Sequence, residues 1–134
     1  MIIMRGLKPL RHPRLWLSLW WLAVALVFVV CLVPAPDLPM VAPGGDKIEH
    51  FLAYFLLAAS AVQLYQGRRA LWRVAIGLVV LGIVVEFAQG ALTTTRSMDP
   101  WDAVADAIGV AMGFAIALTP LRDLLLRLET RMFR

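Results

Sequence analysis

Four residues that can do chemistry stand together at the start of one apolar segment: Asp46, Lys47, Glu49 and His50. Carboxylates and imidazole rings exchange protons and bind metal ions, whereas a lysine ammonium binds anions. A helix that begins here places Asp46, His50 and Tyr54 on one face, because residues four apart lie above one another. The segment therefore indicates a polar site at one end of an apolar helix.

Two further apolar segments carry polar residues that helical spacing would gather on one face. Glu86 and Gln89 are three residues apart within GIVVEFAQG, and Asp102 and Asp106 are four residues apart in a segment that begins after Asp99. The candidates for catalysis are Glu86, His50 and Asp106. The candidates for anion or ligand binding are Lys47, Arg96, His50, Tyr54, Glu86, Gln89, Asp99, Asp102 and Asp106.

The composition places these residues in a membrane protein. Hydrophobic residues make up 61% of the 134 residues, and charged residues make up only 16%. The mean hydropathy is +0.79. A water-soluble domain needs more polar surface, so we expect a single membrane domain over residues 1–134. The net charge is only +4, and the basic residues form short clusters between apolar runs, which argues against nucleic acid as a partner.

Four apolar segments are long enough to cross a bilayer as helices. The first is too long for the apolar region of a signal peptide, and no small-residue cleavage site follows it. Prolines from Pro34 to Pro43 separate it from the second segment, and a polar turn from Gln66 to Arg73 separates the second from the third. We predict an all-α, polytopic bundle of four transmembrane helices. The predicted spans are residues 15–33, 48–64, 74–92 and 103–118.

The basic residues orient the predicted bundle. Eleven of the 13 lysines and arginines fall on one side, and only Lys47 and Arg96 fall on the other. Because positive charge marks the cytoplasmic side, we expect both termini in the cytoplasm and His50 near the outer face. In the tail, from Leu121 to Met132, leucines form one stripe and arginines lie mostly opposite. This pattern predicts an amphipathic C-terminal helix on the cytoplasmic membrane surface.

Some of the polar residues also have a structural explanation. Asp46 with Glu49 fits a helix N-cap and its partner, and Asp99 fits the N-cap of a helix with Pro100 at its first position. Ionisable side chains that face lipid are unfavourable, so we expect the three polar faces to converge inside the bundle. Glu86 has apolar neighbours on both sides, and a structural role for it requires a partner. The expected partners are His50, Lys47 or Arg96.

The basic residues at the outer side leave two interpretations open. Lys47 places a cation at a helix N-terminus, against the helix dipole, so an anionic group is expected beside it. Lys47 and Arg96 either bind a phosphate headgroup at the helix N-termini or pair with Asp46, Asp99 and Asp102.

Two further pairs complete the candidates. Tyr54 and Gln89 either hydrogen-bond across the bundle or contribute to the site. Gly109 and Gly113 are spaced as in the small-residue motif that lets membrane helices approach closely.

Three segments resemble, in order, motifs of the VanZ-like membrane proteins, a family named for an accessory protein of teicoplanin resistance. They are DKIEHFLAYFLL, EFAQ and RSMDPWDAVADAIGVAMG, and the resemblance covers residues 46–113. Asp106 stands where many members have Asn, which adds a negative charge or a proton shared with Glu86. The resemblance implies a multi-pass protein of the bacterial inner (cytoplasmic) membrane, linked to the cell envelope or to antibiotic resistance. It implies no particular reaction.

Two functions fit these observations. In the first, the outer site binds an anionic envelope lipid or a lipid-linked cell-wall precursor, with Lys47 and Arg96 on the phosphate. In the second, His50, Glu86 and Asp106 hold a metal ion, or His50 and Glu86 form an acid–base pair, in an intramembrane hydrolase or transferase acting on a lipid-linked phosphate or ester. The sequence has no HExxH or G-x-S-x-G motif, so it assigns no metal site, no cofactor and no enzyme class. Membrane lipids are the expected partners, and transport would require a homo-oligomer.

Overall fold

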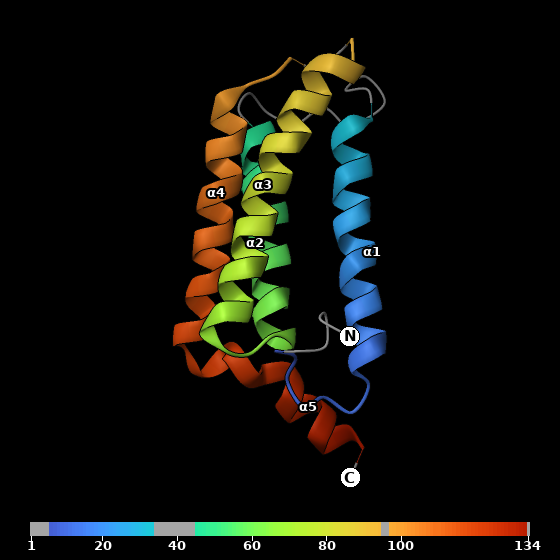
Figure 1. The fold of residues 1–134 in the computed structure, drawn as a ribbon, viewed down its shortest axis with the longest axis vertical. Helices are drawn as coiled ribbons and strands as arrows, with labels where there is room; N and C mark the ends of the chain where they lie inside the picture. Colours follow the sequence, from blue (N-terminus) through green and yellow to red (C-terminus); the bar gives the residue numbers. More distant parts are fainter. Residues whose placement is uncertain (1–5, 34–44, 95–96, 134) are drawn as a thin grey trace.

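The computed structural model describes residues 6–33, 45–94 and 97–133, which are helical apart from their connections and one isolated β-bridge between Leu7 and Tyr65. The helices are α1 (Pro13–Leu32), α2 (Gly45–Leu64), α3 (Arg68–Leu92), α4 (Pro100–Ala115) and α5 (Leu124–Met132), with 3-10 turns at Ile116–Leu118 and Pro120–Asp123. The four long helices run along the long axis, and each is antiparallel to the next (Figure 1). The short helix α5 lies beyond one end of this bundle.

Three helices of the described chain are long and apolar enough to cross a membrane: α1, α3, and α4 together with the turn that follows it, Pro100–Leu118. The expectation of a membrane protein is therefore supported, with three helices of this kind. Helix α2 is not among them, because its first two turns carry Asp46, Lys47, Glu49 and His50. It nevertheless lies alongside the other long helices (Figure 1).

The helix boundaries differ from the predicted spans, most of all at the start of α3. The predicted polar turn from Gln66 to Arg73 is wrong, because α3 already begins at Arg68. Gly67 has a φ of 84°, in the left-handed region that glycine adopts without strain, so the chain reverses directly after α2. The arginines then occupy the first turns of α3. Helices α2 and α4 also begin three residues before the predicted spans, at Gly45 and Pro100.

Helix α2 packs most closely against α4. Gly109 and Gly113 of α4 face the backbone of α2. A Cβ atom at Gly113 would lie 2.6 Å from the carbonyl oxygen of Phe55, and one at Gly109 would collide with the carbonyl oxygen of Phe51. The missing side chains therefore allow the two backbones to approach, as the spacing of the glycines predicts. This close contact sets the position of the polar residues on both helices.

The N-terminal segment and α5 meet at the opposite end of the bundle through Glu129, which is 2% exposed. Its carboxylate accepts hydrogen bonds from the backbone N–H groups of Arg11, at 2.5 Å, and His12, at 3.0 Å, and from the indole N–H of Trp16, at 2.9 Å. This junction was not predicted from the sequence. Glu129 is thus a buried acid of α5 that binds the start of α1.

Candidate functional site

Three helices each bring one buried ionisable side chain to a common point. His50 of α2, Glu86 of α3 and Asp106 of α4 are 4%, 3% and 1% exposed. One ring nitrogen of His50 and one carboxylate oxygen of each acid lie within 4.8 Å of one another. Because the helices alternate in direction, residues near the starts of α2 and α4 meet residues near the end of α3. The structure thus brings together the three residues that the sequence marks as candidates for catalysis, here called the His50–Glu86–Asp106 cluster.

Asp106 is held between α2 and α3. Its Oδ1 lies 3.0 Å from Nδ1 of His50. On its other side it faces Gly82, where a Cβ atom would lie only 2.7 Å from Oδ2 of Asp106. The other ring nitrogen of His50, Nε2, lies 4.0 Å from Oδ2 of Asp102. Because Gly82 has no side chain, the carboxylate of Asp106 fits between α2 and α3 inside the bundle.

Lys47 pairs with two acids at the start of α4: Asp99, which is the N-cap, and Asp102, which lies in the first turn. Its Nζ donates to Oδ2 of Asp99 at 2.6 Å and to Oδ1 of Asp102 at 3.0 Å. Of the two interpretations left open by the sequence, the structure supports ion pairing for Lys47. The hydrogen bonds from Lys47 and from the N–H of Trp101 hold the pKa of the Asp99 carboxyl below its usual range.

The two predicted helix caps have different outcomes. Asp99 is the N-cap of α4, where its side chain accepts a hydrogen bond from the N–H of Trp101 at 2.9 Å, so that prediction is confirmed. The cap predicted at Asp46 is wrong, because α2 begins at Gly45 and Asp46 lies within its first turn. Its carboxylate accepts from the N–H of Lys47 at 2.9 Å. Arg96, the second predicted basic residue of the site, lies outside the described residues.

Glu86 has a partner that the sequence did not suggest. Its Oε2 accepts a hydrogen bond from the backbone N–H of Asp99 at 3.0 Å, which joins the end of α3 to the start of α4. The expected side-chain partner is thus replaced by a backbone amide. The other oxygen, Oε1, has no hydrogen-bond partner among the described residues. The same holds for Oδ2 of Asp106 and for the hydroxyl of Tyr54, and all three atoms are buried.

Tyr54 and Gln89 belong to different surroundings. Tyr54 is fully buried one turn after His50, and its hydroxyl interacts electrostatically with Asp106 and Glu86. It therefore lies beside the cluster. Gln89 is also buried, but its side-chain N–H donates to the carbonyl oxygen of Cys31 at 2.8 Å and ties α3 to α1. Gln89 thus hydrogen-bonds across the bundle, the alternative that the sequence left open.

The charges around the cluster favour a cation over an anion. Among the described residues, the carboxyl groups of Glu86, Asp99, Asp102 and Asp106 are linked through Lys47, His50 and one backbone N–H, and Lys47 is already paired with two of them. In a low-dielectric interior such an excess of carboxylates repels phosphate and attracts metal ions or protons.

Comparison with protein-family models, curated proteins and solved structures finds no match to this chain. The resemblance to VanZ-like proteins therefore stays an expectation, carried by the three segments between residues 46 and 113.

Proposed function

We propose that this chain is a multi-pass membrane protein that holds one divalent metal ion in the His50–Glu86–Asp106 cluster. With that ion it acts as a hydrolase or transferase on a lipid-linked phosphate or ester. The observation that carries the proposal is the pair of unpartnered, buried carboxylate oxygens, Oε1 of Glu86 and Oδ2 of Asp106, beside an imidazole ring.

A cation accounts for both unpartnered oxygens at once. A buried carboxylate oxygen without a donor is strongly unfavourable, and more so inside a membrane. A divalent ion between Glu86 and Asp106 satisfies both oxygens and offsets their repulsion. The three ligand atoms lie within 4.8 Å of one another, so side-chain rotations that draw them closer by about 1 Å would let them bind one ion at the ~2.0–2.2 Å typical of zinc with nitrogen and oxygen ligands.

The donor set limits the choice of metal. One imidazole and two carboxylates suit Zn²⁺ or Mn²⁺ better than Ca²⁺, which takes 6–8 oxygen ligands. Three protein ligands also leave a position for water or a substrate oxygen, the arrangement of catalytic rather than structural metal sites. A metal ion there would polarise a phosphoryl or carbonyl oxygen and lower the pKa of bound water.

The neighbouring residues supply the remaining parts of such a site. The hydrogen bond that Nδ1 of His50 donates to Oδ1 of Asp106 orients the imidazole ring within the cluster. Tyr54, whose hydroxyl has no described partner, is placed to donate a hydrogen bond to a substrate oxygen. In hydrolysis of a lipid diphosphate, the water oxygen would bond to the terminal phosphorus while the P–O bond to the bridging oxygen breaks. The bridging oxygen leaves with the lipid phosphate, and the proton that the water loses balances its charge.

The membrane setting is part of the proposal. With α2 as a fourth crossing, the charge distribution supports an orientation with both termini in the cytoplasm and the cluster in the outer half of the bilayer. The segments that resemble VanZ-like proteins support a place in the bacterial envelope, where lipid-linked cell-wall precursors carry phosphate esters. Direct binding of an anionic headgroup by Lys47 is less favoured, because Lys47 is paired with Asp99 and Asp102.

A reconstituted assay tests this function. The full chain in nanodiscs is treated with a chelator, supplied with Zn²⁺ or Mn²⁺, and incubated with a polyprenyl diphosphate while phosphate release is measured. We expect release that needs the metal and is lost in Glu86→Gln and Asp106→Asn. Glu49→Gln, an exposed acid on α2, is the matched control and should retain activity. The proposal would be contradicted if no metal-dependent release occurs while the wild type retains intact lipid and Lys47→Ala loses it. The chain would then be a lipid-binding protein and not an enzyme.

A further inference from the structure

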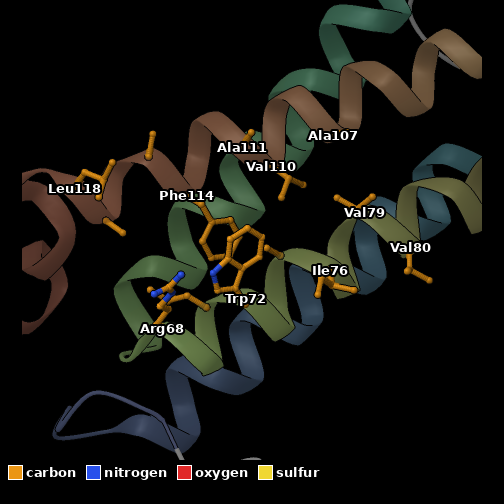
Figure 2. A pocket seen from close by; sticks show the side chains of 14 residues that line it. Arg68, Trp72, Ile76, Val79, Val80, Ala107, Val110, Ala111, Phe114 and Leu118 are labelled. Atoms are coloured by element: carbon orange, nitrogen blue, oxygen red, sulfur yellow. The ribbon is translucent and has the colours of Figure 1, made fainter.

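An apolar groove runs between α3 and α4. Its volume is about 660 Å³, and the side chains that line it are apolar except for Arg68 at one end. Figure 2 shows Trp72 beside Phe114, Arg68 and Leu118 toward one end, and Val79, Val80 and Ala107 toward the other.

The groove arises from the distribution of small residues on α4. Gly109 and Gly113 draw α4 against the backbone of α2. On the face toward α3, Ala107 and Ala111 are too short to fill the space opposite Ile76 and Val80 of α3. The same helix thus packs tightly on one side and leaves a hollow on the other.

The length of the groove fits one half of a bilayer. It extends along α3 from Arg68 to Val80, which is roughly 18 Å at the rise of an α-helix. Half of a hydrocarbon core of ~30 Å is ~15 Å. The hollow therefore matches the depth that one acyl chain occupies in a single leaflet.

The charge of the groove lies at one end only. Arg68 is exposed, and no acid of the described chain forms an ion pair with it. Arg69 and Arg73 lie on the same turns of α3, also exposed and without an ion pair in the described part of the chain. Trp72, which lines the groove beside Arg68, is 60% exposed, as is usual for tryptophan at a membrane interface.

We propose that this α3–α4 groove binds one acyl chain of an anionic phospholipid, with the lipid phosphate on Arg68. Apolar walls of leaflet length end at an arginine that forms no ion pair within the described chain, and this pattern matches a lipid chain with a negatively charged headgroup. A second copy of the chain offers no comparable match, because its helices would leave Arg68 without an anion. This inference depends on the membrane setting and not on the metal cluster, from which the Arg68 end is separated along α3.

Native mass spectrometry of the full chain from nanodiscs tests the lipid site. The discs contain equal amounts of a phosphatidylglycerol and a phosphatidylcholine with the same acyl chains. We expect wild type to retain one phosphatidylglycerol in preference to phosphatidylcholine. Arg68→Gln should reduce that preference by about fivefold, the effect of one basic residue at an anionic membrane surface. Arg127→Gln, an exposed arginine of α5, is the matched control and should leave it unchanged.

A second variant tests the hollow itself. Ala111→Leu fills the groove and should reduce the retention of phosphatidylglycerol. Ala25→Leu, on the exposed face of α1, should leave it unchanged. Equal retention of both lipids by the wild type, or retention that neither Arg68→Gln nor Ala111→Leu reduces, would overturn the proposal. A wild-type dimer that Ala111→Leu dissociates would overturn it in favour of a second copy. Failure here leaves the metal-dependent activity testable, because none of these variants lies in the His50–Glu86–Asp106 cluster.

Discussion

Nδ1 of His50 and Oδ1 of Asp106 lie 3.0 Å apart and join α2 to α4 inside the bundle. The contact uses one oxygen of Asp106 and leaves the other, Oδ2, without a partner among the described residues. The bond therefore has two consequences that mutation can separate: it orients the histidine ring, and it holds a free carboxylate oxygen beside Glu86.

Asp106→Asn should separate folding from metal binding. The amide oxygen can still accept a hydrogen bond from His50, so we expect the variant to fold and to keep the α2–α4 contact. It loses one carboxylate ligand, so its affinity for Zn²⁺ or Mn²⁺ should fall at least about tenfold. Thermal unfolding in detergent measures the first effect, and metal titration measures the second. An unchanged affinity would remove Asp106 from the ligand set.

Lys47→Gln distinguishes a cation site from an anion site. Lys47 neutralises Asp99 and Asp102, so its loss makes the surroundings of the cluster more negative. We expect affinity for Mn²⁺ to rise by no more than about fivefold, because solvent screens a partly exposed ion pair. If instead the variant binds the metal with unchanged affinity and releases a bound anionic lipid, Lys47 binds the lipid headgroup.

Gly113→Ala should weaken the contact between α2 and α4. The added Cβ atom would meet the carbonyl oxygen of Phe55 and the Cβ of Ala58, both at 2.6 Å. Overpacking of this kind costs about 1–3 kcal/mol of unfolding free energy. Gly77→Ala, in α3, is the control: its Cβ atom meets nothing within 4 Å in the described structure. There, better helix propensity should raise stability by up to about 1 kcal/mol. Equal changes in unfolding free energy for the two variants would contradict the close packing of α2 and α4.

Glu129 should make the junction of α1 and α5 sensitive to acid. Burial favours the neutral carboxyl, but the hydrogen bonds from Trp16, Arg11 and His12 outweigh it and lower the pKa of Glu129. Because the pKa is lower in the folded state, the unfolded state binds the proton more readily as the pH falls. The stability that Glu129 contributes is thus complete above its ordinary pKa and is lost as the pH falls through the folded value.

Glu129→Gln tests this junction. At pH 7 the variant should unfold at a temperature lower by on the order of 5 °C, and it should lose less stability than wild type between pH 6 and pH 3. Thermal unfolding followed at several pH values measures both effects. The control is Glu49→Gln, an exposed acid near the start of α2. Parallel pH profiles for wild type and Glu129→Gln would show that the carboxylate contributes nothing.

Features encoded by short-range patterns were predictable from the sequence. The Asp99-Pro100 pair gives the cap of α4, and the spacing of Gly109 and Gly113 gives the close approach to α2. Apolar runs gave the helices that can cross a membrane. The predicted start of α3 was wrong, because the arginines after Gly67 suggested a turn, whereas the chain reverses within residues 65–67.

Contacts to the backbone of another helix were not predictable. Glu86 bonds the N–H of Asp99, and Gln89 bonds the carbonyl of Cys31. Every residue carries such groups, so no side-chain pattern marks which ones will be used. The pairing of Lys47 with two acids was one of two alternatives, and only the packing of α2 on α4 distinguishes them.

The central claim is that the His50–Glu86–Asp106 cluster holds a divalent ion. The most direct measurement is the metal content of the full chain, loaded with Zn²⁺ or Mn²⁺ after chelation and weighed by native mass spectrometry, for wild type, Glu86→Gln and Glu49→Gln. We predict one ion per chain in wild type and in Glu49→Gln, and none in Glu86→Gln. A wild type that binds no ion, with Glu86→Gln folded and more stable, would mean that the two acids share a proton and that the metal centre does not exist.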